Sequence, residues 1–195
     1  MKKSIILIAA MCMTSVMTFA QDIIRVSTDK TDLVMKVSPK GRLYQVYLGD
    51  KFLNPADYNN LKWDVYAASD GAVCQRGHEV YATSGAEDFF EPAVAVTHAD
   101  GNMTTYLYYQ SSEQKAVKGG TETVITLKDK VYPLTVKLHY VAYAKENVIK
   151  AWSEISHKEK APITLWRYSS TMLYFKSNKY FLTNYHSKKD RKSVV

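Results

Sequence analysis

The sequence predicts an all-β fold, a large antiparallel supersandwich of two sheets. Three observations indicate this fold. Apolar residues occupy every second position of 134–140, which is the pleat of a half-buried strand. Turn signals recur at short intervals without helical crossovers between them. The 195 residues include 15 Tyr, and Val and Thr are also abundant, as is typical of strands.

The first two predicted elements end in a clear turn. Short apolar or alternating runs occupy 23–27 and 32–37. The turn Ser38-Pro39-Lys40-Gly41 follows, in which Pro fixes φ and Gly accepts a positive φ. The run 43–48 then returns as the second arm of a hairpin.

Later segments supply further strands. Asp100-Gly101, a dipeptide favoured in tight turns, separates 93–97 from 103–110 and predicts a second hairpin. The runs 148–155 and 163–175 are apolar on both faces in part, which predicts inner strands covered by a second sheet.

The first twenty residues, 1–20, have the three parts of a secretory signal peptide. Two lysines begin it, an apolar region runs to Met17, and Thr18-Phe19-Ala20 offers a cleavage site. The apolar region is shorter than the roughly 20 residues that cross a bilayer, so we expect no membrane span. Met11 stands where a lipoprotein would carry a small residue before Cys12, so lipid attachment is disfavoured. We expect an exported protein, periplasmic or extracellular.

Cleavage leaves roughly 175 residues, enough for one domain with a sizeable core. It also leaves one cysteine, Cys74, so an intramolecular disulfide is excluded. The formal charge of +7 is concentrated in the leader and in the basic run 188–192. Because a nucleic-acid surface needs a basic stripe interleaved with aromatics on one face, we expect no nucleic-acid partner.

Residues 188–195 are expected to be a non-native tail. The last six residues can be back-translated into one frame of a common sequencing adapter, ending at a stop codon. A genuine solvated basic tail is the alternative. We therefore expect the natural protein to continue beyond this point.

One run carries the most specific motif of the chain. It reads Gly85-Ala86-Glu87-Asp88-Phe89-Phe90-Glu91-Pro92-Ala93 and resembles the signature Gly-x-x-Asp-Phe-x-x-Pro-Ala of the amino-terminal domain of glycoside hydrolase family 36, the bacterial α-galactosidases. Four further segments resemble that domain in the same order: 43–49, 134–149, 165–170 and 180–186. The residues assigned to the signature are Gly85, Asp88, Phe89, Pro92 and Ala93.

The resemblance implies that 21–187 form a β-supersandwich that precedes a catalytic (β/α)8 barrel. A barrel takes roughly 250 residues, so this chain stops before it. The family's two catalytic aspartates lie at barrel strand ends, so no residue here inherits a catalytic role. The expected partners are the missing barrel in cis, further subunits of a homo-oligomer and, through the whole enzyme, an α-galactoside oligosaccharide. No cofactor is expected.

The long connection from Asn54 to Gly77 breaks the strand pattern, and such connections are usually functional or mobile. In family 36 an acidic residue from this part of the sandwich can reach the sugar site, sometimes of a neighbouring subunit. Asp57 is our candidate for it, and Trp63 in the same loop is a candidate sugar-stacking ring. The alternative for Asp57 is a solvated loop acid.

Other chemistry-bearing residues have simpler interpretations. Asp88 and Glu91 would lie on opposite faces of a strand, so we expect Asp88 to cap a turn and Glu91 to be extended before Pro92. The five histidines show no spacing typical of a metal site, and we predict none. Several aromatic residues fall within predicted strands, where core or sheet-covering roles are expected: Tyr106, Tyr108, Tyr109, Trp152 and Trp166.

The sequence thus predicts the amino-terminal domain of an exported α-galactosidase, with a structural and oligomerisation role. This interpretation predicts an apolar face left exposed for the barrel. A free-standing carbohydrate-binding module is the alternative, and it predicts a monomer that binds galactosides alone. A third interpretation is an exported structural protein without a ligand.

Overall fold

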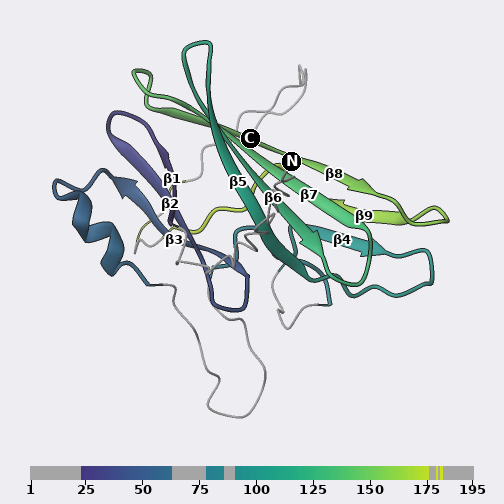
Figure 1. Cartoon of the computed structure of the whole chain (residues 1–195). Coiled ribbons are helices and arrows are strands. Elements are labelled where there is room, and N and C mark those ends of the chain that lie inside the picture. Colours follow the sequence, from purple (N-terminus) through teal and green to yellow (C-terminus); the bar gives the residue numbers. More distant parts are fainter. Residues whose placement is uncertain (1–22, 63–77, 86–90, 176–178, 180, 182–195) are drawn as a thin grey trace, which may run out of the picture.

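The computed structural model describes residues 23–62, 78–85, 91–175, 179 and 181. This part of the chain contains nine strands and one short 3-10 helix, η1 (Figure 1). In chain order the elements are β1 (Ile23–Ser27), β2 (Thr31–Val37), β3 (Leu43–Asp50), η1 (Pro55–Asn60), β4 (Val94–Thr97), β5 (Leu107–Val117), β6 (Gly120–Asp129), β7 (Leu134–Tyr143), β8 (Val148–His157) and β9 (Thr164–Tyr168). The predicted all-β fold is confirmed.

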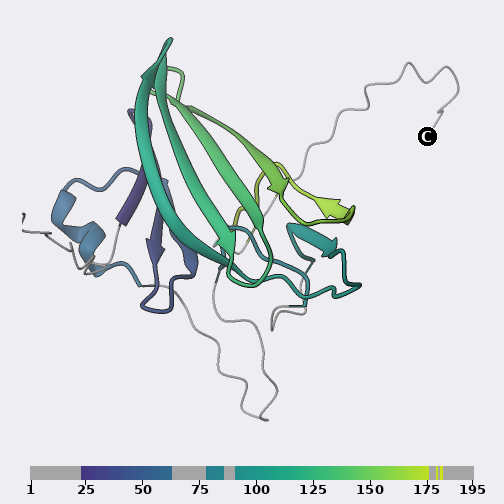
Figure 2. The same cartoon turned by 45° about the vertical axis from the view of Figure 1, so that its right-hand side comes forward.

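The first sheet has the order β1-β2-β3 and is antiparallel throughout. The predicted turn joins β2 to β3: the Gly41 N–H donates to the Ser38 carbonyl at 2.8 Å, and Gly41 has a φ of 80°. β2 is buried on both faces because one face meets the second sheet and the other is covered by η1. Figure 2 shows η1 on the far side of β1–β3 from the long strands.

The second sheet is an antiparallel meander of order β5-β6-β7-β8. The predicted alternating strand lies in β7, where Leu134, Val136, Leu138 and Tyr140 are 2% exposed or less. A two-residue turn at Gly119 (φ 79°) joins β5 to β6. At Gly120, an added Cβ would lie 2.3 Å from the Ala142 carbonyl oxygen, so only glycine lets β6 approach β7 this closely.

The core lies between these two sheets, which face each other as layers (Figure 2). Side chains from both sheets join one buried cluster, among them Val26, Met35, Leu43, Ile125, Val136 and Leu138. The antiparallel two-sheet sandwich is therefore confirmed. In the described part, no helix is long and apolar enough to cross a membrane.

The predicted hairpin around Asp100-Gly101 is wrong. The turn itself forms, with a φ of 89° at Gly101, but β4 pairs with β9 and makes a separate two-stranded sheet. The chain after the turn bonds elsewhere: the Thr105 N–H donates to the Ser84 carbonyl and the Tyr106 N–H to the Asp129 carboxylate. A local turn signal does not fix which strand becomes the partner, because that choice rests on distant contacts.

The prediction that 148–155 and 163–175 are inner strands is also wrong. β8 is an edge strand of the second sheet, and all five residues of β9 are exposed. On β8, Ile149, Ala151 and Ile155 pack against the core, whereas the other face meets solvent. In the described structure no second layer covers these strands.

Candidate functional site

The segment that carries Asp57 is anchored on the outer face of β1–β3. Tyr58 of η1 is 2% exposed, and its hydroxyl donates to the Asp32 carboxylate. The ring of Tyr58 stacks on Phe52, with centroids 4.6 Å apart, and the Arg25 guanidinium lies 4.0 Å from its centroid. η1 is therefore held by a buried aromatic side chain rather than by its own short helix.

The charge beneath η1 is balanced. Asp32 is fully buried and lies 3.1 Å from an Arg25 nitrogen. Burial alone would raise the pKa of Asp32, but hydrogen bonds from Ser27 and Tyr58 and the charge of Arg25 outweigh it and hold the pKa below its ordinary value. Asp32 therefore stays ionised as a fixed acceptor for the Tyr58 hydroxyl.

Lys36 of β2 supports the end of η1. Its side chain is almost completely buried, and Nζ donates to the Asn59 carbonyl at 3.0 Å and to the Leu61 carbonyl at 2.5 Å. These carbonyls lie at the C-terminal end of η1, where backbone acceptors lack helical partners and a cation is favourable. Burial lowers the pKa of Lys36. Neither Lys36 nor Asp32 was singled out from the sequence, because nothing local marks a charge in a strand as buried.

Asp57 itself is exposed on this anchored segment. Asn54 caps the start of η1, its side chain accepts from the Ala56 N–H at 3.1 Å, and Asp57 lies in the first turn. The geometry presents a carboxylate to solvent from a fixed base, as a residue serving an external site would require. Trp63 lies outside the described residues, so the predicted neighbourhood of Asp57 and Trp63 stays a prediction.

The signature run is described only at its ends. Gly85 has a φ of 74°, and an added Cβ would lie 2.8 Å from Thr104 Cα, so this position needs glycine. Ala93, which follows Pro92, is 2% exposed, and its N–H donates to the Ala82 carbonyl at 2.8 Å. Asp88 and Phe89 lie outside the described residues.

Glu91, which we expected to be extended before Pro92, forms an ion pair with Arg167 of β9. The pair bridges the entry to β4 and its sheet partner β9. Both side chains are largely in water, which favours a modest contribution to stability.

Exposed apolar residues gather in β9 and the chain after it. We call these residues the β9 apolar segment: Leu165, Trp166, Tyr168, Leu173 and Phe175, which are 38% to 70% exposed. Tyr168 pairs with Val94 and Leu165 with Val96, and both valines are fully buried. Since paired residues share a face of the sheet, Leu165 and Tyr168 continue the core outward into solvent. Trp166 was expected in a core or sheet-covering role, yet it is 68% exposed.

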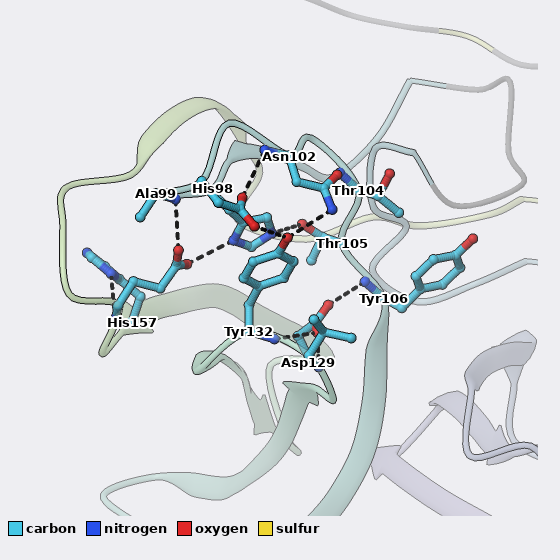
Figure 3. Close-up of polar contacts among 12 residues, drawn as sticks. His98, Ala99, Asn102, Thr104, Thr105, Tyr106, Asp129, Tyr132 and His157 are labelled. Atoms are coloured by element: carbon cyan, nitrogen blue, oxygen red, sulfur yellow. Dashed lines mark hydrogen bonds and ion pairs between the residues drawn. The ribbon is translucent and has the colours of Figure 1, made fainter.

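A second polar cluster has the hydrogen-bond pattern of a nucleophile, a base and an orienting acid (Figure 3). His98 Nε2 lies 2.9 Å from Thr105 Oγ1, and His98 Nδ1 lies 2.8 Å from Glu159, whose other oxygen accepts from the Ala99 N–H at 2.9 Å. Thr105 is fully buried, His98 is 2% exposed, and the Tyr132 ring stacks on the imidazole at 3.5 Å. In the described part of the chain both Thr105 and His98 are buried, and the cluster connects the loop after β4 to the loop after β8.

The second conspicuous histidine lies on the outer face of the second sheet. His139 Nδ1 lies 2.9 Å from Glu122, and the imidazole stacks on Trp152 with centroids 4.7 Å apart. Lys115 lies 3.0 Å from the other Glu122 oxygen. Among the described residues, no group of three or more His, Cys, Asp and Glu side chains could hold a metal ion.

The sandwich has clear relatives among solved structures. It matches the α-galactosidase from Lactobacillus brevis with a TM-score of 0.62 and 21% identity, over 78% of this chain. It matches the galactosidase domain of the alpha-galactosidase-sucrose kinase AgaSK with a TM-score of 0.66 and 20% identity, over 77% of this chain. It matches AgaA from Geobacillus stearothermophilus with a TM-score of 0.64 and 22% identity, again over 77%. In each case the chain covers 24% of the solved structure. Among proteins of curated function, none matches the chain.

These likenesses define the class by fold: a β-sandwich of the type found in α-galactosidases. The family model described as the glycosyl hydrolase family 36 N-terminal domain matches residues 41–186. The chain therefore belongs to glycosyl hydrolase family 36, through its N-terminal domain.

Proposed function

We propose that the chain is the N-terminal domain of an exported α-galactosidase that hydrolyses terminal α-linked galactose. The match of the family model along 41–186 carries this proposal. The related AgaA has been solved in complex with raffinose and with stachyose, which supports a galactoside as the substrate class. The leader-like residues 1–20 support export.

Within that enzyme, the domain packs against the catalytic part through the β9 apolar segment. Exposed apolar side chains that continue a core are costly in water and are typical of an interface. Hot spots of interfaces are rich in Trp, Tyr and Arg, and β9 carries Trp166, Arg167 and Tyr168 in succession. The domain therefore has a structural role, and we further propose that it contributes subunit contacts in a homo-oligomer.

The η1 segment lends Asp57 to the sugar site. The carboxylate is exposed to solvent, and the η1 segment that carries it is held in place by Tyr58 and Lys36. It can therefore accept hydrogen bonds from sugar hydroxyls with little loss of conformational entropy. A solvated loop acid without a role is the competing interpretation.

The first test extends the chain. We expect the source DNA to continue in frame past codon 186 into a barrel with two catalytic aspartates, and the longer purified protein to release nitrophenol from a nitrophenyl α-galactoside. We expect the 195-residue chain to release none. Release by the short chain, or an inactive longer protein with intact aspartates, contradicts the proposal.

Asp57 is then tested in the longer protein. Asp57→Asn should lower kcat/KM by about tenfold, because one charge-assisted hydrogen bond to the substrate is weakened. Asp29→Asn, at another exposed acid, is the matched control and should leave kcat/KM unchanged. Equal activity of both variants would assign Asp57 to solvent.

A further inference from the structure

A polar groove of about 850 Å³ lies between the edge of β1 and the second sheet. Figure 1 shows the β5–β6 hairpin running past the end of β1, and residues of β1, β5 and β6 line the groove. Its lining includes Arg25, Lys51, Ser112, Gln114, Thr121 and Thr123. The volume falls in the range of about 300–1,000 Å³ that is typical of small-ligand sites.

The inner face of the second sheet changes from apolar to polar where it lines this groove. On β5, the core residues Leu107 and Tyr109 give way to Ser112 and Gln114. Gln114 pairs with Thr123 of β6, so these side chains share one face. Burying polar groups without hydrogen-bond partners is strongly unfavourable. This end of the face is therefore suited to water or a polar ligand, and not to an apolar segment.

The charges of the groove nearly cancel. Arg25 lies 3.1 Å from Asp32, so this cation is paired. The lining holds one further cation, Lys51, whose Nζ donates to the Thr28 carbonyl at 2.8 Å, and one carboxylate, Glu113. A phosphate or nucleic-acid ligand needs an excess of cations. What the groove offers is a near-neutral set of hydroxyl, amide and backbone groups, which complements a neutral molecule rich in hydroxyls.

The edge of β1 does not favour the addition of a peptide strand. The Gln114 side chain donates to the Arg25 carbonyl at 2.8 Å and to Thr123 Oγ1 at 3.0 Å. In an antiparallel strand, the N–H and C=O groups of one residue point to the same side. Both backbone groups of Arg25 therefore point away from β2, at the middle of the free edge of β1. Gln114 thus blocks that edge at its centre, and an added strand would have to displace it.

We propose that this groove binds a neutral oligosaccharide. The proposal goes beyond the function assigned above, since it requires neither Asp57 nor a catalytic part. Its one aromatic lining residue, Tyr109, is 8% exposed and bonds Ser112 through its hydroxyl at 3.0 Å. Without an exposed ring for stacking in the described lining, we expect a Kd of about 1 mM.

The test is an NMR titration of the 195-residue chain with stachyose and, separately, with maltotetraose. We expect saturable shifts of the Arg25, Ser112, Gln114 and Thr123 amides with at least one sugar. The double variant Ser112→Val, Gln114→Leu should weaken binding at least tenfold. Ser111→Val is the matched control, because Ser111 is exposed on the opposite face of β5. This variant should bind the sugar as tightly as the unaltered chain.

Several outcomes would overturn the groove site. One is no shift with either sugar, and another is shifts that map away from the groove. Shifts of β1 amides that depend on protein concentration alone would assign the edge to strand pairing between copies. If the double variant fails to fold, the positions of the shifted amides in the unaltered chain still test whether the sugar binds in the groove. The assay involves no hydrolysis, so failure of the proposed enzyme function leaves its result intact.

Discussion

The side chain of Gln45 binds both backbone groups of Tyr174, a residue 129 positions later. Gln45 Nε2 donates to the Tyr174 carbonyl at 2.6 Å, and the Tyr174 N–H donates to Gln45 Oε1 at 3.1 Å. One amide side chain thus replaces a strand neighbour and fixes the chain after β9 against β3. The Tyr174 ring also stacks on His78 at 4.4 Å. This contact determines where the β9 apolar segment ends on the surface.

Gln45→Leu should release that attachment. Gln45 is 6% exposed, so its loss leaves two backbone groups of Tyr174 without their partners. We expect a loss of about 1–3 kcal/mol in the free energy of unfolding. Hydrogen exchange should show faster exchange at 171–175. Gln110→Leu, at an exposed glutamine, is the control. Equal exchange at 171–175 in both variants would show that the Gln45–Tyr174 hydrogen bonds do not hold this segment in place.

Gly85→Ala and Gly101→Ala separate steric conflict from backbone conformation. Both glycines have a positive φ, of 74° and 89°, but only at Gly85 would a Cβ collide, at 2.8 Å from Thr104 Cα. Gly101→Ala should therefore cost about 1 kcal/mol, and Gly85→Ala about 3 kcal/mol or more. Urea unfolding measures both values. Equal costs would mean that the neighbourhood of Gly85 relaxes freely.

Lys36→Met should loosen η1 without breaking β2. Methionine fills similar volume but leaves the Asn59 and Leu61 carbonyls without their donor. We expect faster proteolysis within 52–62 and a loss of about 1–3 kcal/mol. Lys62→Met, at an exposed lysine beside the same segment, should leave both quantities unchanged.

Protonation of Glu122 should contribute to the loss of folding stability at acid pH. Its hydrogen bonds with His139 and then Lys115 hold the pKa of Glu122 below its ordinary value of 4.5. The unfolded chain then binds this proton more readily than the folded chain, so the contribution is complete above the ordinary pKa and is lost as pH falls through the folded pKa. The free energy of unfolding, measured from neutral to acid pH, should decline less steeply in Glu122→Gln than in the unaltered chain. An unchanged slope would remove Glu122 from the acid response.

Polar substitution of the β9 apolar segment should improve solution behaviour. Trp166 and Tyr168 are 68% and 70% exposed, so Trp166→Ser with Tyr168→Ser removes little packing. We expect less self-association by light scattering and weaker binding of an apolar dye, with the unfolding free energy nearly unchanged. A large loss of stability would instead show that these rings are part of the core.

The predicted strands are close to those observed where local signals were strong. The run 23–27 coincides with β1, and the Ser38–Gly41 turn forms as expected because Pro and Gly restrict it locally. Alternation in 134–140 correctly marked a half-buried strand of β7. The pairing of β4 with β9 and the exposure of β8 and β9 were missed, because partner choice and cover depend on contacts distant in sequence.

The sequence by itself determined the all-β class and the family, because periodicity and motifs are local properties. Only the tertiary structure showed that Lys36 and Asp32 lie buried beneath η1, that Gln45 holds Tyr174, and that Trp166 faces solvent. Burial is decided by what packs on a residue from elsewhere in the chain. A lysine or tryptophan in a strand has the same local sequence whether it is covered or exposed.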